Sequence, residues 1–173
     1  MNRIICLSVF LCCVGIFAFG QSAPAQKLEA SDIDSFLKNY DAIQASMAAL
    51  DYDLDNVLAD VEGPQEMLNH FRNNETPKEI QDIMRVNGFG SDGLEKITII
   101  IISASGFNLE DMFLSNGIDL NDISGHEYSS ELKEFRDEID TVRELVHPED
   151  LALIRGRTAE IMQVIKGGSF KTL

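Results

Sequence analysis

Residues 31–50 read SDIDSFLKNYDAIQASMAAL, and this stretch decides the fold class. Its apolar side chains recur at steps of three and four residues, the spacing that places them on one face of an α-helix. Ser31 and Asp34 stand at its start as in a capping box, in which a hydroxyl and an acid satisfy amide groups at a helix N-terminus. The stretch therefore predicts an amphipathic helix. Its apolar stripe consists of Ile33, Phe36, Leu37, Tyr40, Ile43, Met47 and Leu50.

Two shorter helices are predicted next, each introduced by a proline. The first runs from Pro64 to about residue 71, since proline is well placed at a first helical position. The second is capped by Thr76, has Pro77 in its first turn and ends at Asn87, which a glycine follows. The two prolines thus mark the beginnings of two separate short helices.

At residues 97–102, which read ITIIII, residue propensity and chain context disagree. A run of β-branched residues favours a strand. A lone strand would have no partner elsewhere in the chain, whereas a helix at the centre of a protein can be apolar on all sides. We therefore predict a helix that begins at Ser91 and that Gly106 ends. A separate short helix is predicted from Asn108 to Asn116.

The C-terminal third contains a second strongly periodic stretch. After a polar loop at residues 118–125, apolar residues from Leu132 to Val146 share one face of a helix. Pro148 then marks a sharp corner, and a last helix runs up to Gly167. Two long helices joined by so short a turn are expected to pack as an antiparallel hairpin. The sequence thus predicts an all-α protein, an irregular bundle of about six or seven helices that ends in this hairpin.

The N-terminus has the pattern of a secretory signal peptide. Arg3 precedes an apolar run from Ile4 to Phe19, which is shorter than the roughly 20 residues that span a bilayer. Small residues fit cleavage after Gly20, and cleavage after Ala25 is the alternative. We prefer the first, because it adjoins the apolar run. The protein is therefore expected in the periplasm or outside the cell, with no stable membrane anchor after cleavage.

All three cysteines, Cys6, Cys12 and Cys13, lie in this leader. Bacterial lipoproteins are cut just before a cysteine, but Phe10 and Leu11 are too bulky for that cleavage site. We expect a mature protein without disulfides or thiol nucleophiles, which packing alone must stabilise.

Cleavage after Gly20 leaves 173 − 20 = 153 residues, enough for one domain with a sizeable core. The predicted organisation is a signal peptide at residues 1–20, a flexible tether at 21–30, a single helical domain at 31–168 and a C-terminal tail at 169–173.

The chain is strongly acidic, with 29 Asp and Glu residues against 14 Lys and Arg residues and a formal charge of −15. Loss of Arg3 with the leader makes this −15 − 1 = −16. Nucleic acid is therefore excluded as an expected partner, since a phosphate backbone needs a positive face, and an anionic membrane is disfavoured for the same reason. The charge suits a cation or a basic partner, although solvated helix faces explain it equally.

Residues 51–62, DYDLDNVLADVE, match the ligand spacing of an EF-hand calcium loop. Asn56 replaces the usual glycine, and Gly63 and Pro64 stand where an exiting helix should continue. One long helix, or two joined at Asp51, explains the same residues without a metal. Calcium is the one cofactor that the sequence suggests. Its predicted ligands are Asp51, Asp53, Asp55, Val57 and Glu62.

No complete catalytic constellation can be assembled from the sequence, so no enzyme is expected. His126 and Glu127 begin like a zinc protease motif, but Ser130 stands where the second histidine is required. His70 and His147 lie near a helix end and beside a proline corner, where capping or packing is the usual role of a histidine.

Three parts of the chain carry a resemblance: FLKNY at residues 36–40, the middle segment that ends in GF at 88–89, and PEDLALI at 148–154. Together they resemble small exported bacterial all-helical proteins of no established function. The resemblance covers most of the mature chain and implies an exported helical fold, but its motifs are helix-packing phrases and imply no catalytic residue.

The predicted function is that of an exported soluble helical protein, periplasmic or secreted, that binds another protein or a small ligand between its helices. A calcium-binding module at residues 51–62 is the alternative. The methionines can supply adaptable apolar surface or simply fill the core. They are Met47, Met67, Met84, Met112 and Met162.

Overall fold

The computed structural model describes residues 25–50, 52, 61, 63–123 and 129–169. This part of the chain contains seven helices and no strand, so the predicted all-α class is confirmed. The predicted signal peptide, the preferred cleavage site after Gly20 and most of the C-terminal tail lie outside it. The helices are α1 (Ala30–Ala48), α3 (Gly63–Asn73), α4 (Lys78–Val86), α5 (Gly93–Ser115), α6 (Ser129–Leu145), α7 (Pro148–Arg155) and α8 (Thr158–Ser169).

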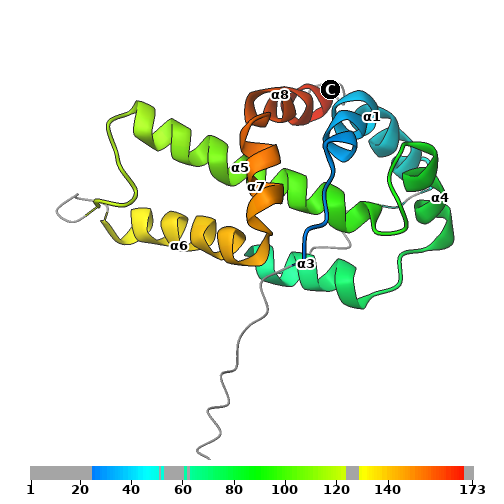
Figure 1. Cartoon of the computed structure of the whole chain (residues 1–173), viewed down its shortest axis with the longest axis horizontal. Coiled ribbons are helices and arrows are strands. Elements are labelled where there is room, and N and C mark those ends of the chain that lie inside the picture. Colours follow the sequence, from blue (N-terminus) through cyan, green and yellow to red (C-terminus); the bar gives the residue numbers. More distant parts are fainter. Residues whose placement is uncertain (1–24, 51, 53–60, 62, 124–128, 170–173) are drawn as a thin grey trace, which may run out of the picture.

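Helix α5 is the axis of the fold and contacts each of the other described helices (Figure 1). Its first half carries the ITIIII run, and Ile99 and Ile100 there are at most 1% exposed. This half lies in the main core, where several of its side chains are buried, so it needs no polar face and a helix forms despite the β-branched residues. The prediction of a helix over a strand at residues 97–102 is confirmed.

Gly106 does not end α5, contrary to the sequence prediction. The two helices predicted at 91–106 and 108–116 are one helix, which ends at the predicted Asn116 with Gly117 in a left-handed conformation (φ +77°). A glycine inside a helix costs about 1 kcal/mol relative to alanine. Here α6 packs against this part of α5, and a Cβ on Gly106 would lie 3.8 Å from Cγ1 of Ile139. That packing outweighs the poor helix propensity.

The predicted C-terminal hairpin is not confirmed. The last helix is divided by a turn at Gly156 and Arg157 into α7 and α8, and α6 packs against α3 and α5 while α7 and α8 pack against α1 and α5. The turn is held by the Arg157 N–H, which donates to the carbonyl of Ile154 at 2.9 Å. The two helices predicted at residues 91–116 form one helix, and the predicted last helix forms two. The number of helices in the described part therefore still agrees with the predicted six or seven.

The folded part begins before the predicted Ser31. Leu28 is 1% exposed, and the N–H groups of Lys27 and Leu28 donate to the two carboxylate oxygens of Asp150 at 2.8 and 3.0 Å. These residues of the predicted tether therefore belong to the domain. The helix cap also lies earlier than predicted, since the Glu29 N–H donates to Asp32 Oδ2 at 2.8 Å.

The apolar residues form two cores of unequal size. The larger core lies in the main part of the molecule, which we call the body. All seven described helices contribute to it, α6 only through its C-terminal half. The smaller lies in what we call the arm, residues 106–123 and 129–139, where the second half of α5 and the first turns of α6 run side by side away from the body (Figure 1). The buried members of the arm core are Leu120, Ile123, Leu132 and Ile139.

Candidate functional site

All five predicted calcium ligands, Asp51, Asp53, Asp55, Val57 and Glu62, lie outside the described residues. Between them Tyr52 is described and half-buried. Its N–H donates to the carbonyl of Met47 at 3.1 Å, and burial raises the pKa of its phenol. Elsewhere, within the residues that the structure describes, no group of three or more His, Cys, Asp or Glu side chains is arranged to hold a metal.

Of the three histidines, two are described, and His147 acts as a helix cap. Its Nδ1 accepts a hydrogen bond from the Glu149 N–H at 3.2 Å, at the beginning of α7. The ring of His70 lies edge-on to the ring of Phe71, with 5.2 Å between the centroids. His147 therefore has the capping role that its place beside Pro148 suggested, while His126 lies outside the described residues.

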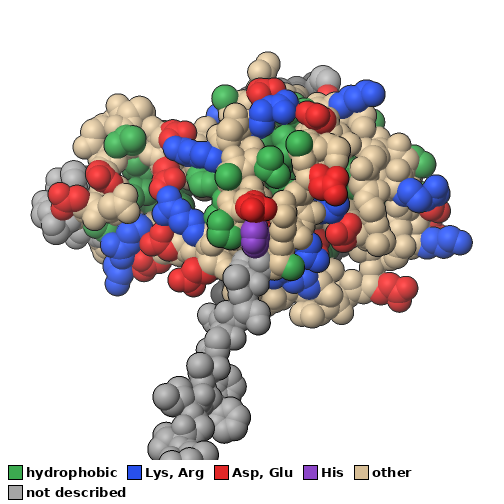
Figure 2. All heavy atoms as spheres, viewed as in Figure 1, with side chains coloured by type: hydrophobic (Ala, Val, Ile, Leu, Met, Phe, Trp, Pro, Cys, Tyr) green, Lys and Arg blue, Asp and Glu red, His purple; other side chains and the backbone are tan. Residues whose placement is uncertain are grey.

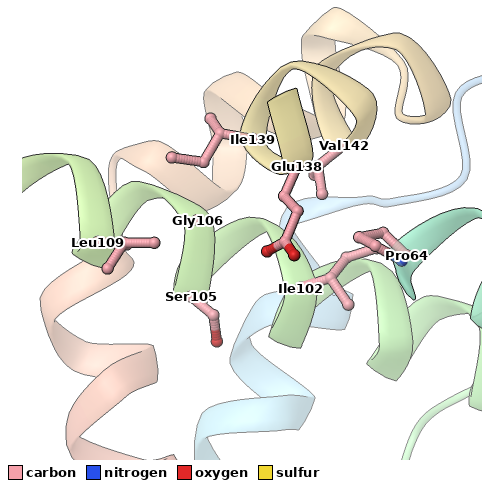
Figure 3. A pocket seen from close by; sticks show the side chains of 8 residues that line it. All are labelled: Pro64, Ile102, Ser105, Gly106, Leu109, Glu138, Ile139 and Val142. Atoms are coloured by element: carbon pink, nitrogen blue, oxygen red, sulfur yellow. The ribbon is translucent and has the colours of Figure 1, made fainter. Parts of the chain in front are cut away.

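An apolar groove lies where the arm joins the body, between α5, α6 and the beginning of α3. Its volume is about 210 Å³. Helix α5 lines it with residues spaced three and four apart, so they share one face. In Figure 3 the side chain of Glu138 extends from α6 toward α5, and its carboxylate lies over an otherwise mostly apolar lining. The lining residues are Pro64, Ile102, Ser105, Gly106, Leu109, Glu138, Ile139 and Val142.

Exposed apolar side chains continue the groove toward the tip of the arm. Met112 and Phe113 follow Leu109 at helical spacing on α5, and the ring of Phe113 lies 5.5 Å from that of Phe135 on α6. Met112 is 48% exposed and Phe135 39%. Contiguous apolar surface of this kind marks interaction sites more often than isolated exposed residues do.

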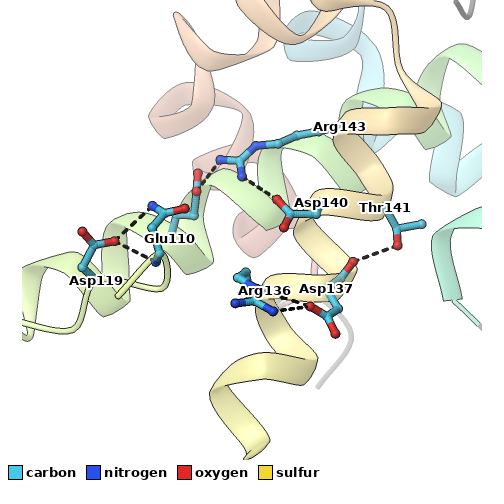
Figure 4. Close-up of polar contacts among 8 residues, drawn as sticks. Glu110, Asp119, Arg136, Asp137, Asp140, Thr141 and Arg143 are labelled. Carbon is cyan, nitrogen blue, oxygen red and sulfur yellow. Dashed lines mark hydrogen bonds and ion pairs between the residues drawn. The ribbon is translucent and has the colours of Figure 1, made fainter. Parts of the chain in front are cut away.

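The charged side chains around the arm are mostly paired, and the surplus is negative. Helix α6 carries six acids and three bases, so its side chains sum to 3 − 6 = −3. Figure 4 shows Arg136 paired with Asp137 at 2.9 Å and Arg143 held between Asp140 at 2.9 Å and Glu110 of α5. Burial lowers the pKa of Arg143, but the hydrogen bonds of the two carboxylates outweigh it and raise the pKa above its usual value.

Glu138 differs from these neighbouring acids, because no ion pair or hydrogen bond engages its carboxylate within the described part of the chain. Figure 2 shows the general pattern on one face of the molecule, where acidic and basic side chains lie next to one another with apolar ones between them. A ligand that carries a cation next to an apolar group would complement this site, because the cation would pair with the carboxylate and the apolar group would enter the groove.

The apolar residues from Leu132 to Val146 were predicted to share one face of a helix, but the groove beside them was not predicted. A signal was present, since Glu138 stands on the same side of α6 as Phe135 and Val142. The opposite wall comes from α5, which was expected to end at Gly106.

Of the described helices, α5 alone is long and apolar enough to cross a membrane. Its first half is surrounded by other helices of the body, which is the situation of the core helix in a water-soluble protein. The central place of this half in the fold accounts for the apolar composition of this half.

Comparison of the chain with protein-family models, with curated proteins and with solved structures finds no match in any of the three. The resemblance to small exported bacterial helical proteins stays a prediction.

Proposed function

We propose that this protein is an exported binding protein whose arm takes an apolar segment of a basic partner protein. The observation that carries the proposal is the apolar groove with the unpaired Glu138 at its edge. An apolar side chain of the partner enters the groove, and a lysine or arginine beside it pairs with Glu138.

The size of the groove favours a protein partner over a small molecule. Small-molecule sites usually measure about 300–1,000 Å³, whereas this groove measures about 210 Å³ and opens onto exposed Met112 and Phe135. Such a volume suits one or two anchoring side chains, which commonly carry most of the binding energy of a protein interface. The surrounding apolar surface would exclude water from that anchor.

Charge favours a basic partner over a second copy of this chain. The arm is acidic, and the whole chain carries −15. Two copies that met through this surface would bring like charges together, whereas a basic protein would be attracted and would bind faster at low salt.

The export half of the proposal is supported by the leader pattern at residues 1–20. A periplasmic or secreted location follows from it. Protease accessibility of the chain in intact cells, together with the mass of the mature protein, measures both the location and the position of cleavage.

The binding half is tested with a peptide probe titrated into the full chain by calorimetry. The probe is a peptide that forms an amphipathic helix with one leucine-rich face and one lysine-rich face. In a matched second peptide, glutamate replaces each lysine. We expect the basic peptide alone to bind. Ser105→Phe, which fills the groove from an exposed position, and Glu138→Lys should each weaken binding about tenfold or more.

Glu144→Lys is the matched control, because it makes the same charge change on α6 at an exposed position outside the groove lining. If Glu138→Lys and Glu144→Lys lose the same affinity for the basic peptide, the loss comes from the overall charge of the protein. That result would contradict a binding site at the groove. Equal binding of the acidic peptide would contradict the basic partner.

The calcium alternative concerns residues outside the described part and is tested separately. A ligand that binds only the folded state at a hundred times its dissociation constant adds about 2.7 kcal/mol to stability. Thermal melting with calcium, magnesium and chelator should show a calcium-specific rise that Glu62→Gln abolishes if the loop binds calcium, and no change if it does not.

A further inference from the structure

A second hollow, far more polar than the groove, lies at the other end of α5. It is formed by the N-terminal segment, the end of α3, the loop into α4 and the first turn of α5, and its volume is about 360 Å³. This volume lies within the range of small-molecule sites. The residues used in the argument below are Lys27, Phe71, Arg72, Glu75, Asp92 and Glu95.

The floor of this polar hollow is a buried carboxylate with two cations on it. The side chain of Glu95 is 7% exposed, and its oxygens contact Arg72 Nε at 2.7 Å and Lys27 Nζ at 3.4 Å. Three separate parts of the chain supply these groups. Removing charges from water is expensive, and apolar replacements for a buried ion pair are often neutral or stabilising. A buried charged cluster at the floor of a hollow is therefore a candidate for ligand recognition.

Arg72 retains hydrogen-bonding capacity toward the hollow. Its Nε is used by Glu95, while no hydrogen bond or ion pair engages its two terminal amino groups within the residues that the structure describes. The side chain of Arg72 is 30% exposed, so a ligand can reach it. A guanidinium with two free parallel donors matches the geometry of a carboxylate.

Two further acids that line the hollow supply negative charge. Glu75 is exposed and makes no ion pair within the described residues, and Asp92 lies 3.9 Å from Lys96 Nζ, at the limit of an ion pair. Two cations and three carboxylates line the hollow, a sum of 2 − 3 = −1. An anionic ligand would meet the acidic surplus, and a cationic ligand would meet Arg72 and Lys27. A ligand with both charges satisfies both sides.

We propose that the polar hollow binds a small zwitterion of the size of a free amino acid. Its carboxylate pairs with the terminal amino groups of Arg72, its ammonium group pairs with Glu75 and Asp92, and its side chain lies against the ring of Phe71. The inference is independent of the groove, with which the polar hollow shares no lining residue.

The test is calorimetric titration of the full chain with each of the twenty L-amino acids, with glucose and with inorganic phosphate. We expect at least one amino acid to bind. Its N-acetyl derivative and its carboxamide should each bind about tenfold more weakly or worse, because each removes one of the two charges. Glu75→Gln should weaken the amino acid about as much as acetylation does, and it leaves the buried Glu95 cluster intact. Glu79→Gln, an exposed acid outside the hollow, should change nothing.

The proposal is overturned if no amino acid binds at millimolar concentration, if the blocked derivatives bind as well as the parent amino acid, or if only glucose or phosphate binds. Arg72→Lys provides a second check. This variant keeps a positive charge beside Glu95 but loses the pair of parallel donors. The protein should therefore still fold, while its affinity for the carboxylate of the amino acid falls.

Discussion

The two halves of α5 belong to one helix, yet they have opposite surroundings. In the first half, Ile99 and Ile100 are at most 1% exposed. In the second half, Met112 is 48% exposed and Leu114 64%. The first half is covered by the body and the second chiefly by α6, so apolar composition alone does not tell whether a helix is buried. Whether a helix is buried depends on how many other helices pack around it.

The same difference separates the two cores. Side chains such as Phe36, Ile154 and Ile161 in the body are fully buried, whereas the buried side chains of the arm are 4–8% exposed. Local stability rises with the number of buried apolar contacts. The arm is therefore expected to open without unfolding the body, and the proposed binding surface lies on the part of the protein that can adjust to a partner.

The largest expected effect is that of a cavity in the body. Ile100→Ala removes part of a side chain with no exposed surface and should lower the free energy of unfolding by about 2–5 kcal/mol. Leu132→Ala, in the arm core, should cost about half as much, because the smaller core can relax around it. Equilibrium denaturation by urea measures both. Equal losses would mean that the arm is as well packed as the body.

A somewhat smaller loss is expected where the body holds its N-terminal segment. Asp150→Asn replaces one of the two oxygens that accept the N–H groups of Lys27 and Leu28 with an amide donor, and should cost about 2–3 kcal/mol. The amides of those two residues should then exchange hydrogen faster. Glu149→Gln, exposed on the same helical turn, is the control and should have no measurable effect. Unchanged exchange in Asp150→Asn would show that residues 27 and 28 do not depend on this carboxylate.

Hydrogen exchange in the unmutated protein compares the regions directly. Amides at residues 97–104 should exchange only through global unfolding. Those at residues 130–138 should exchange through local opening, at a free energy about 1–3 kcal/mol lower. Denaturant should change the first rates strongly and the second little. A common free energy for both would remove the distinction between arm and body.

The smallest effect is expected at Ser103, in the first half of α5. Its Oγ is buried without a hydrogen-bond partner in the described part of the chain. Ser103→Ala should therefore leave stability unchanged or raise it by up to about 1 kcal/mol. At Thr158 the buried Oγ1 donates to the carbonyl of Ile154 at 3.1 Å, so Thr158→Val should lower stability by about 1 kcal/mol. Thermal melting distinguishes the opposite signs.

Periodicity was sufficient to predict α1 and α6, because a buried stripe repeats within one turn and is visible locally. Boundaries that depend on other helices were not predictable. Gly106 looks like a stop, but α6 packs against α5 there and the helix continues. Residues 27–29 look like part of a tether, and only the position of Asp150, more than a hundred residues away, shows that they are fixed. The groove was missed for the same reason, since its walls come from three helices.

The bond between the N-terminal segment and Asp150 also constrains the order in which the protein can fold. The Leu28 amide and its acceptor are separated by 122 positions in the sequence, and α1 packs against α8. A chain that emerges from the ribosome N-terminus first cannot bury Leu28 until α7 has been synthesised. Contacts of such long sequence separation form late and slow folding. The nascent chain therefore stays incompletely folded until nearly its whole length has emerged from the ribosome.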